Sequence, residues 1–143
     1  MLAGGGAAEL QAQCEGNNKV KLLGRISDQE LNAYYLASDI ISFPSITKNE
    51  AFGLALAEGM YFGKPAITFT IPGSGVNYVN LDGITGIECP NRDVKAFAEA
   101  MMKLKNDPEL RHTLGANARQ RVIDNFLYST YRQSINELID SLL

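Results

Sequence analysis

DIISFPSITKNEAFGLALAEGMYFGKPAITFT, residues 39–70, is the stretch of this sequence that most directly predicts the fold. It opens with a short apolar run, residues 39–44, that is typical of a buried strand. Residues 51–62 then suit a helix that a glycine and a proline end, and residues 65–70 form a second apolar run. Two strands joined by a helix are parallel, because an antiparallel pair needs only a short hairpin.

The same alternation of strands and helices continues on both sides of this unit. Strands are predicted at residues 20–26 and within 82–90, and a loop is predicted at 71–77. One helix is predicted at 7–14 and another is expected to begin at the capping box Ser27–Glu30. Further helices are expected after the caps Asp93 and Asp107 and at about 129–142. Alternating strands and helices favour an α/β fold, with a Rossmann-like parallel sheet covered by helices on both faces. The part from about 93 to 142 is expected to be helical throughout.

Length and composition exclude several classes of protein. The 143 residues favour a single domain, residues 1–143, and no apolar run approaches the ~20 residues of a membrane-spanning helix. The net charge of −3 provides no general attraction for nucleic acid. Cys14 and Cys89 form no disulfide framework, which favours a reducing, cytoplasmic compartment. His112 is the only histidine, so neither a histidine triad nor a histidine-rich metal site is expected.

The chain begins abruptly for a complete α/β domain. Its first residues, MLAGGG, look like the end of a strand followed by a glycine turn. We therefore expect that the domain lacks its first strands and that a longer protein precedes it.

Two carboxylates, Glu50 and Glu58, enclose a glycine at the start of the predicted helix. A helix start presents unpaired N–H groups and a partial positive charge, which suits an anion such as a phosphate. Gly53 allows a phosphate to approach the N–H groups of Gly53 and Leu54, and Glu58 is placed to accept hydrogen bonds from ribose hydroxyls. Acids also favour helix starts through the dipole alone, by ~0.3–1 kcal/mol each. The residues by themselves leave these two interpretations evenly balanced.

Four blocks of the sequence resemble the retaining, family 4 glycosyltransferases of the GT-B architecture, also described as glycosyl transferases group 1. The similarity covers roughly residues 20–126, in the family's order: VKLLGRISDQELNAYYLASDIISFPS, EAFGLALAE, AEGMYFGKPAIT and DGITGIECPNRDVKAFAEAMMKLKNDPELRHTLGANAR. The second block is similar to the family's E-x7-E segment.

The resemblance implies one half of a two-domain enzyme. The chain is similar to the C-terminal, donor-binding domain, and the N-terminal acceptor domain is missing. The family's phosphate-binding Arg and Lys, normally just upstream, have no match in this sequence, so the fragment alone is expected to be inactive. The implied reaction is hexosyl transfer with retention, from a UDP-, GDP- or ADP-sugar, without metal or cofactor. Many relatives act on lipid carriers, so the resemblance makes peripheral membrane association a possible property of the parent protein.

The resemblance also assigns roles to the first block and to the motif. Glu58 matches the acid that binds the donor ribose, and Glu50 matches the acid that contacts the transferred sugar and is implicated in catalysis. Phe52, Gly53 and Leu54 match residues that line the donor site, with substrate-binding roles.

Two further substrate-binding positions are Arg25 and Ile26, which match the loop that meets the base. A solvated charge at Arg25 and an apolar strand end at Ile26 are the simpler alternatives. The family acid after the fourth strand is absent, and Asn77 or Asn80 occupies its region.

Two other functions stay open. A sugar-nucleotide epimerase fragment has the same architecture but normally depends on histidines, and a non-catalytic Rossmann-like module would bind nucleotide without transfer. The final helix carries Ile135, Leu138, Ile139 and Leu142 along one side, and its polar side is not basic, so anionic lipid is an unfavourable partner. An exposed stripe of this kind favours a homodimer of the fragment.

Overall fold

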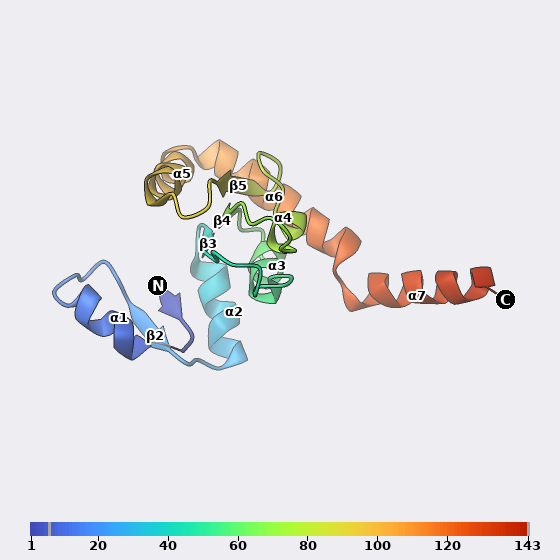
Figure 1. The fold of residues 1–143 in the computed structure, drawn as a ribbon, viewed down its shortest axis with the longest axis horizontal. Coiled ribbons are helices and arrows are strands. Elements are labelled where there is room, and N and C mark those ends of the chain that lie inside the picture. The colour runs from blue at the N-terminus through green and yellow to red at the C-terminus, as the bar shows by residue number, and fades with distance from the viewer. Residues whose placement is uncertain (6, 143) are drawn as a thin grey trace. The chain divides into compact units, whose positions relative to one another are not determined.

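The computed structural model describes residues 1–5 and 7–142, and these form two compact units (Figure 1). The first unit comprises Met1–Ala37 and the second Ser38–Leu143. Each unit has its own parallel sheet and helices.

The first unit is a strand–helix–strand motif followed by a helix. Strands β1 (Leu2–Ala3) and β2 (Leu22–Gly24) pair in parallel, and α1 (Ala7–Cys14) connects them and contacts β2. The next helix, α2 (Asp28–Ala37), begins with the predicted capping box. The N–H of Glu30 donates to the Ser27 hydroxyl at 3.3 Å, and the N–H of Ser27 donates to the Glu30 carboxylate at 2.9 Å.

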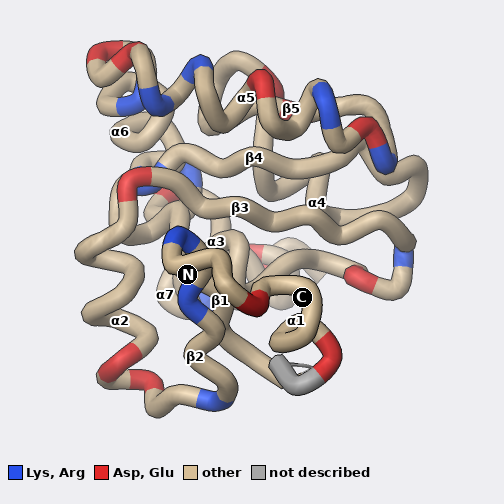
Figure 2. Tube along the Cα trace, turned by 90° about the vertical axis from the view of Figure 1, so that its left-hand side faces the viewer, with Lys and Arg blue, Asp and Glu red and all other residues tan. Residues whose placement is uncertain are grey.

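The second unit has a three-stranded parallel sheet in the order β3-β4-β5, formed by Ile41–Phe43, Ala66–Phe69 and Gly86–Cys89. In Figure 2, β3 and β4 run side by side and carry no Lys, Arg, Asp or Glu. Helix α3 (Leu54–Tyr61) connects β3 to β4, and the short α4 (Val76–Val79) precedes β5. This is the parallel arrangement that residues 39–70 predict.

Three helices complete the chain: α5 (Val94–Asn106), α6 (Pro108–Asn125) and α7 (Tyr128–Leu142). Both predicted caps are formed. The Asp93 carboxylate accepts from the N–H of Ala96 and the Asp107 carboxylate from the N–H of Leu110, each at 2.9 Å. Pro108 occupies the first turn of α6, where its missing N–H has no partner to lose.

Side chains alternate along β4 between two cores, so helices cover both faces of the sheet. One core joins Ala66 to α3, α4 and α6, and the other joins Ile67 and Phe69 to α5 and α6. The fully buried residues Leu56 and Met60 place the inner side of α3 against the first core. The outer side of α3 is therefore exposed to solvent.

The sequence prediction and the structure differ most at the start of α3 and in the segment 71–77. The helix predicted from residue 51 begins at Leu54, because Gly53 has φ 90° and ψ 57° and this left-handed conformation cannot continue a helix. The segment 71–77, predicted as a loop, runs into α4 at Val76. A four-residue helix is too short to show a helical period in the sequence.

Helix α7 extends away from the rest of the second unit (Figure 1), and none of its residues is buried. Its apolar stripe is exposed, with Leu142 the most exposed at 78%. The homodimer stays a prediction. Within residues 1–5 and 7–142, no helix combines the length and the hydrophobicity needed to span a membrane.

Helix α6 packs on the end of α3 through two glycines, which gives a test of this packing. A Cβ atom at Gly115 would overlap the carbonyl oxygen of Gly63. Gly115→Ala is expected to lower the free energy of unfolding by about 1–3 kcal/mol, because the backbone contact cannot yield without moving α6. Urea denaturation measures this change, and Ala116→Ser, at an exposed neighbour, is the control. Equal stability of the two variants would contradict the close packing.

Candidate functional site

The turn between β3 and α3, together with the first part of α3, carries most of the predicted site residues. The chain leaves β3 at Phe43 and enters α3 through Gly53, whose carbonyl accepts the N–H of Ala57 at 3.0 Å. A Cβ atom at Gly53 would lie 3.3 Å from the Leu56 Cβ, and its φ of 90° is unfavourable for other residues. Glycine is thus required here to turn the chain into α3.

Glu50 is half-buried in this turn and bonds to the start of the helix. Its carboxylate accepts the N–H of Gly53 at 2.9 Å. One of the two N–H groups expected to bind a phosphate therefore already bonds to the motif acid Glu50. A carboxylate has about four acceptor positions, so one bond leaves Glu50 able to accept others. The Leu54 N–H is the next along the helix start.

Glu58 lies one turn beyond Leu54 on the same face of α3, since residues four apart on a helix are neighbours. Both residues are exposed, Leu54 at 71%, and so are Ala51 and Ala55. The start of α3 is thus open to solvent on the face that carries the second motif acid. An open helix start beside a carboxylate can bind a phosphate and a polyhydroxylated group together.

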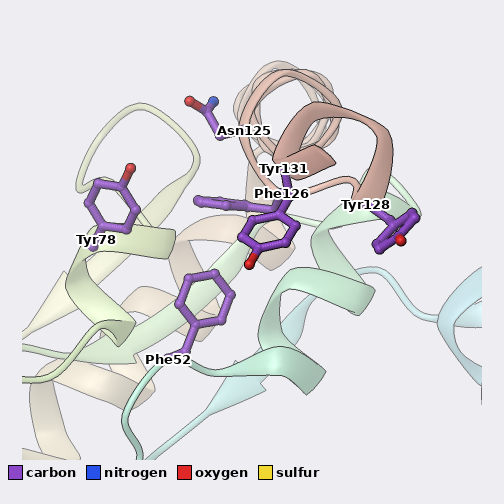
Figure 3. Close-up of a pocket in the computed structure, with 6 residues that line it drawn as sticks. All are labelled: Phe52, Tyr78, Asn125, Phe126, Tyr128 and Tyr131. Atoms are coloured by element: carbon purple, nitrogen blue, oxygen red, sulfur yellow. The ribbon is translucent and has the colours of Figure 1, made fainter. Parts of the chain in front are cut away.

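The ring of half-buried Phe52 points into an aromatic groove. It packs edge-on against Phe126, with ring centroids 5.3 Å apart. The groove, of about 530 Å³, is lined by Phe52, Tyr78, Asn125, Phe126, Tyr128 and Tyr131 (Figure 3). The Arg121 guanidinium lies 5.2 Å from the Tyr78 ring centroid and 5.4 Å from that of Phe126. Phe52 therefore anchors the turn to the end of α6.

Arg25 and Ile26 lie in the first unit, directly after β2. Arg25 is exposed and Ile26 is half-buried. The other five predicted residues, Glu50, Phe52, Gly53, Leu54 and Glu58, lie together in the second unit. Among the residues that the structure describes, no group of three His, Cys, Asp or Glu side chains could hold a metal ion.

The asparagines in the region of the missing family acid both bond to the protein. The Asn77 side chain donates to the Phe69 carbonyl at 3.1 Å and accepts the Ile71 N–H at 2.7 Å. Asn80 is fully buried and joins the hydroxyls of Thr68 and Thr85. These two residues thus support the end of β4.

Glu88 on β5 has an electrostatic environment that the sequence does not reveal. Its carboxylate accepts the Thr70 hydroxyl at 3.3 Å. Partial burial raises the pKa of Glu88, hydrogen bonds from Asn77 and Thr70 oppose this, and the nearby charge of Asp82 raises it further. The folded state therefore binds this proton more tightly than the unfolded state. The resulting stabilisation is present below the ordinary pKa of 4.5 and is lost as pH rises through the folded-state pKa.

Glu88→Gln tests this sign, because the amide keeps the shape without the charge. At pH 7 the variant is expected to be more stable than the wild type, by less than about 1 kcal/mol since the site is partly exposed. Below about pH 4 the difference is expected to vanish. Thermal melts from pH 3 to 8 measure the effect, with Glu99→Gln in α5 as an exposed control. A variant less stable than the wild type at pH 7 would contradict it.

Known proteins are similar in sequence to this chain over most of its length. The sequence profile of the family described as glycosyl transferases group 1 matches residues 2–121. The D-rhamnosyltransferase WbpZ of Pseudomonas aeruginosa is 40% identical over 116 residues, which cover 80% of this chain and 30% of that protein. The O-antigen chain mannosyltransferase C of Escherichia coli is 33% identical over 130 residues, or 88% of this chain and 35% of that one.

The fold agrees as well. Sucrose-phosphate synthase from Thermosynechococcus elongatus superposes with a TM-score of 0.80 at 28% identity, over 94% of this chain and 33% of that one. The chain thus spans about a third of the length of the relatives that it matches. The predicted Rossmann-like fold of GT-B glycosyltransferases is confirmed. This chain belongs to the glycosyl transferases group 1 family.

Proposed function

We propose that this chain binds the nucleoside-diphosphate sugar donor of a glycosyltransferase at the amino end of α3. One observation carries the proposal: Glu50 and Glu58 flank an exposed helix start that follows a parallel strand. Parallel α/β sheets bind ligands beyond the carboxyl ends of their strands. A helix start there favours the negative charge of a diphosphate.

Each motif residue has a proposed role. The Glu58 carboxylate accepts hydrogen bonds from the two ribose hydroxyls, and the helix start with the Leu54 N–H binds the diphosphate. Glu50 contacts the transferred sugar with the acceptor positions that Gly53 leaves unused. Contact of Arg25 and Ile26 with the base stays a prediction from the family resemblance.

The proposed reaction is hexosyl transfer with retention. The names of the relatives, a D-rhamnosyltransferase and a mannosyltransferase, support a hexose or 6-deoxyhexose as the transferred group. The bond from the anomeric carbon to the phosphate oxygen breaks, the acceptor oxygen bonds to the same face, and the departing diphosphate takes the acceptor proton. The helix start stabilises the charge that develops on the diphosphate. No protein nucleophile is required.

For the whole protein, we propose a second domain in addition to this chain. We place the donor-binding part in residues 1–143 and the acceptor site in a separate domain, so the chain alone binds donor without turnover. The free thiols Cys14 and Cys89 support a reducing, cytoplasmic compartment.

Calorimetric titration with UDP, GDP and ADP tests the proposal, with inorganic pyrophosphate as the control for unspecific anion binding. One nucleoside diphosphate is expected to bind with a Kd of about 0.1–1 mM, or roughly −5 kcal/mol. The affinity is low because the phosphate-binding Arg and Lys of the family have no match here. Affinity no higher than that of pyrophosphate for all three nucleotides would reject nucleotide binding. The sugar conjugate of the best-binding nucleotide is titrated as well. If it binds no more tightly than the nucleoside diphosphate, the non-catalytic binding module is the better interpretation.

A further inference from the structure

A second loop holds the backbone of the turn that contains Glu50. The Ser74 hydroxyl, from the loop between β4 and α4, donates to the Glu50 carbonyl at 2.6 Å. The next N–H, of Gly75, donates to the Ala51 carbonyl at 2.8 Å. A Cβ atom at Gly75 would overlap that carbonyl oxygen, so only glycine permits the approach. Two consecutive carbonyls of the turn are thus fixed by two consecutive residues of the loop.

This loop is itself anchored to β4. The Ser74 hydroxyl oxygen accepts the N–H of Val76 at 3.2 Å, which sets its direction. Asn77 binds the Ile71 N–H and the Phe69 carbonyl, at the carboxyl end of the strand. Hydrogen bonds therefore run from β4 through the loop to the backbone of Glu50.

The opposite end of the segment between β3 and α3 has an anchor of its own. The Asn91 side chain, after β5, donates to the Ile46 carbonyl at 3.1 Å. On the α3 side of the second anchor, the carboxylate of Glu50 accepts the N–H of Gly53. Glu50 thus combines a backbone held by Ser74 with a side chain held by the helix start.

We propose that Ser74 is a positioning residue that holds the Glu50 carboxylate in place for the transferred sugar. The inference rests on the proposed function, in which Glu50 meets that sugar. Ser74 acts on the backbone of Glu50, so it influences the sugar contact without touching the nucleotide. Contacts of this kind depend on placement within roughly half an ångström, and supporting hydrogen bonds provide it.

Amide hydrogen exchange of the unliganded protein tests the first step. Ser74→Ala removes the hydroxyl, Ser74→Thr restores it, and Ser42→Ala, at an exposed position of β3, is the matched control. Ser74→Ala is expected to speed exchange at Gly53 about tenfold, as one hydrogen bond is worth about that much. Ser74→Thr and Ser42→Ala are expected to exchange as the wild type does. The Ile67 amide in β4 is expected to stay unchanged in all variants, which separates local release from general destabilisation.

Binding tests the second step. The readout is the affinity of the best-binding nucleotide's hexose conjugate divided by that of the nucleoside diphosphate alone. Ser74→Ala is expected to reduce this ratio several-fold and to leave the affinity of the diphosphate unchanged. Ser74→Thr is expected to restore the ratio, whereas a purely structural role would change both affinities together.

The outcomes separate the inference from the function on which it rests. If the wild type binds a nucleoside diphosphate but Gly53 exchange or the sugar ratio is unaffected in Ser74→Ala, the positioning role is rejected and the proposed function stands. If Gly53 responds but the wild type binds no nucleotide, the proposed function is rejected, and the role of Ser74 toward a sugar is rejected with it.

Discussion

Glu58→Ala is expected to weaken nucleoside-diphosphate binding by about 100-fold, which takes a millimolar affinity beyond measurement. In the proposed complex the Glu58 carboxylate accepts two ribose hydroxyls, and hydrogen bonds to a charged group are worth about 1.5–3 kcal/mol each. Glu58 is exposed on α3, and the inner side of that helix is held by Leu56 and Met60. The substitution is therefore expected to leave the fold unchanged.

Two control variants make this prediction specific. Glu58→Gln keeps one acceptor oxygen and is expected to lose less affinity than Glu58→Ala. Glu99→Ala removes a carboxylate from α5, where Glu99 lies 3.9 Å from the Lys95 amine, and is expected to bind as the wild type does. Calorimetry at constant ionic strength measures all three. If Glu58→Ala binds like Glu99→Ala, Glu58 does not contact the ribose.

Asn80→Ala is expected to lower the free energy of unfolding by about 3 kcal/mol. Asn80 is fully buried, its amide donates to the Thr68 hydroxyl at 3.0 Å, and its oxygen accepts the Thr85 hydroxyl at 2.9 Å. Truncation leaves the buried Thr68 hydroxyl without this partner, at about 1–3 kcal/mol, and opens a cavity. Thr85 can still bond to the backbone of Leu81, which limits the loss.

Asn117→Ala is the matched control for this prediction. The Asn117 amide donates to the Ile84 carbonyl at 3.1 Å, but Asn117 is exposed, so water replaces the lost bond. Its expected loss is within about 0.5 kcal/mol, as for most surface substitutions. Urea denaturation compares the two variants, and equal losses would show that the buried network around Asn80 contributes no special stability.

The parts of the fold that sequence predicted are those with local causes. Asp93 and Asp107 cap helices because their side chains reach an N–H three residues ahead, and such spacing is visible in a sequence. Strand β4 is buried throughout because helices cover both of its faces, and β3 is recognisable from Ile41 and Phe43, which pack against the first core. The start of α3 was misplaced because glycine can occur inside or outside a helix, and only its φ of 90° decides between them.

In the candidate site, too, the features with local causes could be predicted from the sequence and those that arise from tertiary contacts could not. The spacing of Glu50 and Glu58 and the glycine between them predicted a helix start between two acids, and in the structure Glu50 lies before α3 and Glu58 on its second turn. The bond from Ser74 to the Glu50 carbonyl joins residues 24 positions apart and arises only when two loops meet. The raised pKa of Glu88 likewise comes from burial, and the hydrogen bonds from Asn77 and Thr70 that partly oppose it also depend on the tertiary structure. Such tertiary contacts leave no periodic pattern in a sequence.

The most direct test of the account is residue-resolved NMR of the amide groups during titration with UDP, GDP and ADP and their hexose conjugates. We predict that one series shifts the resonances from Glu50 to Glu58, with the largest changes at Gly53 and Leu54, and that the sugar conjugate extends the shifts around Glu50. Shifts at Arg25 and Ile26 would support their predicted contact with the base. Saturable shifts confined to the aromatic groove around Phe126, with residues 50–58 unmoved, would contradict a diphosphate at the amino end of α3.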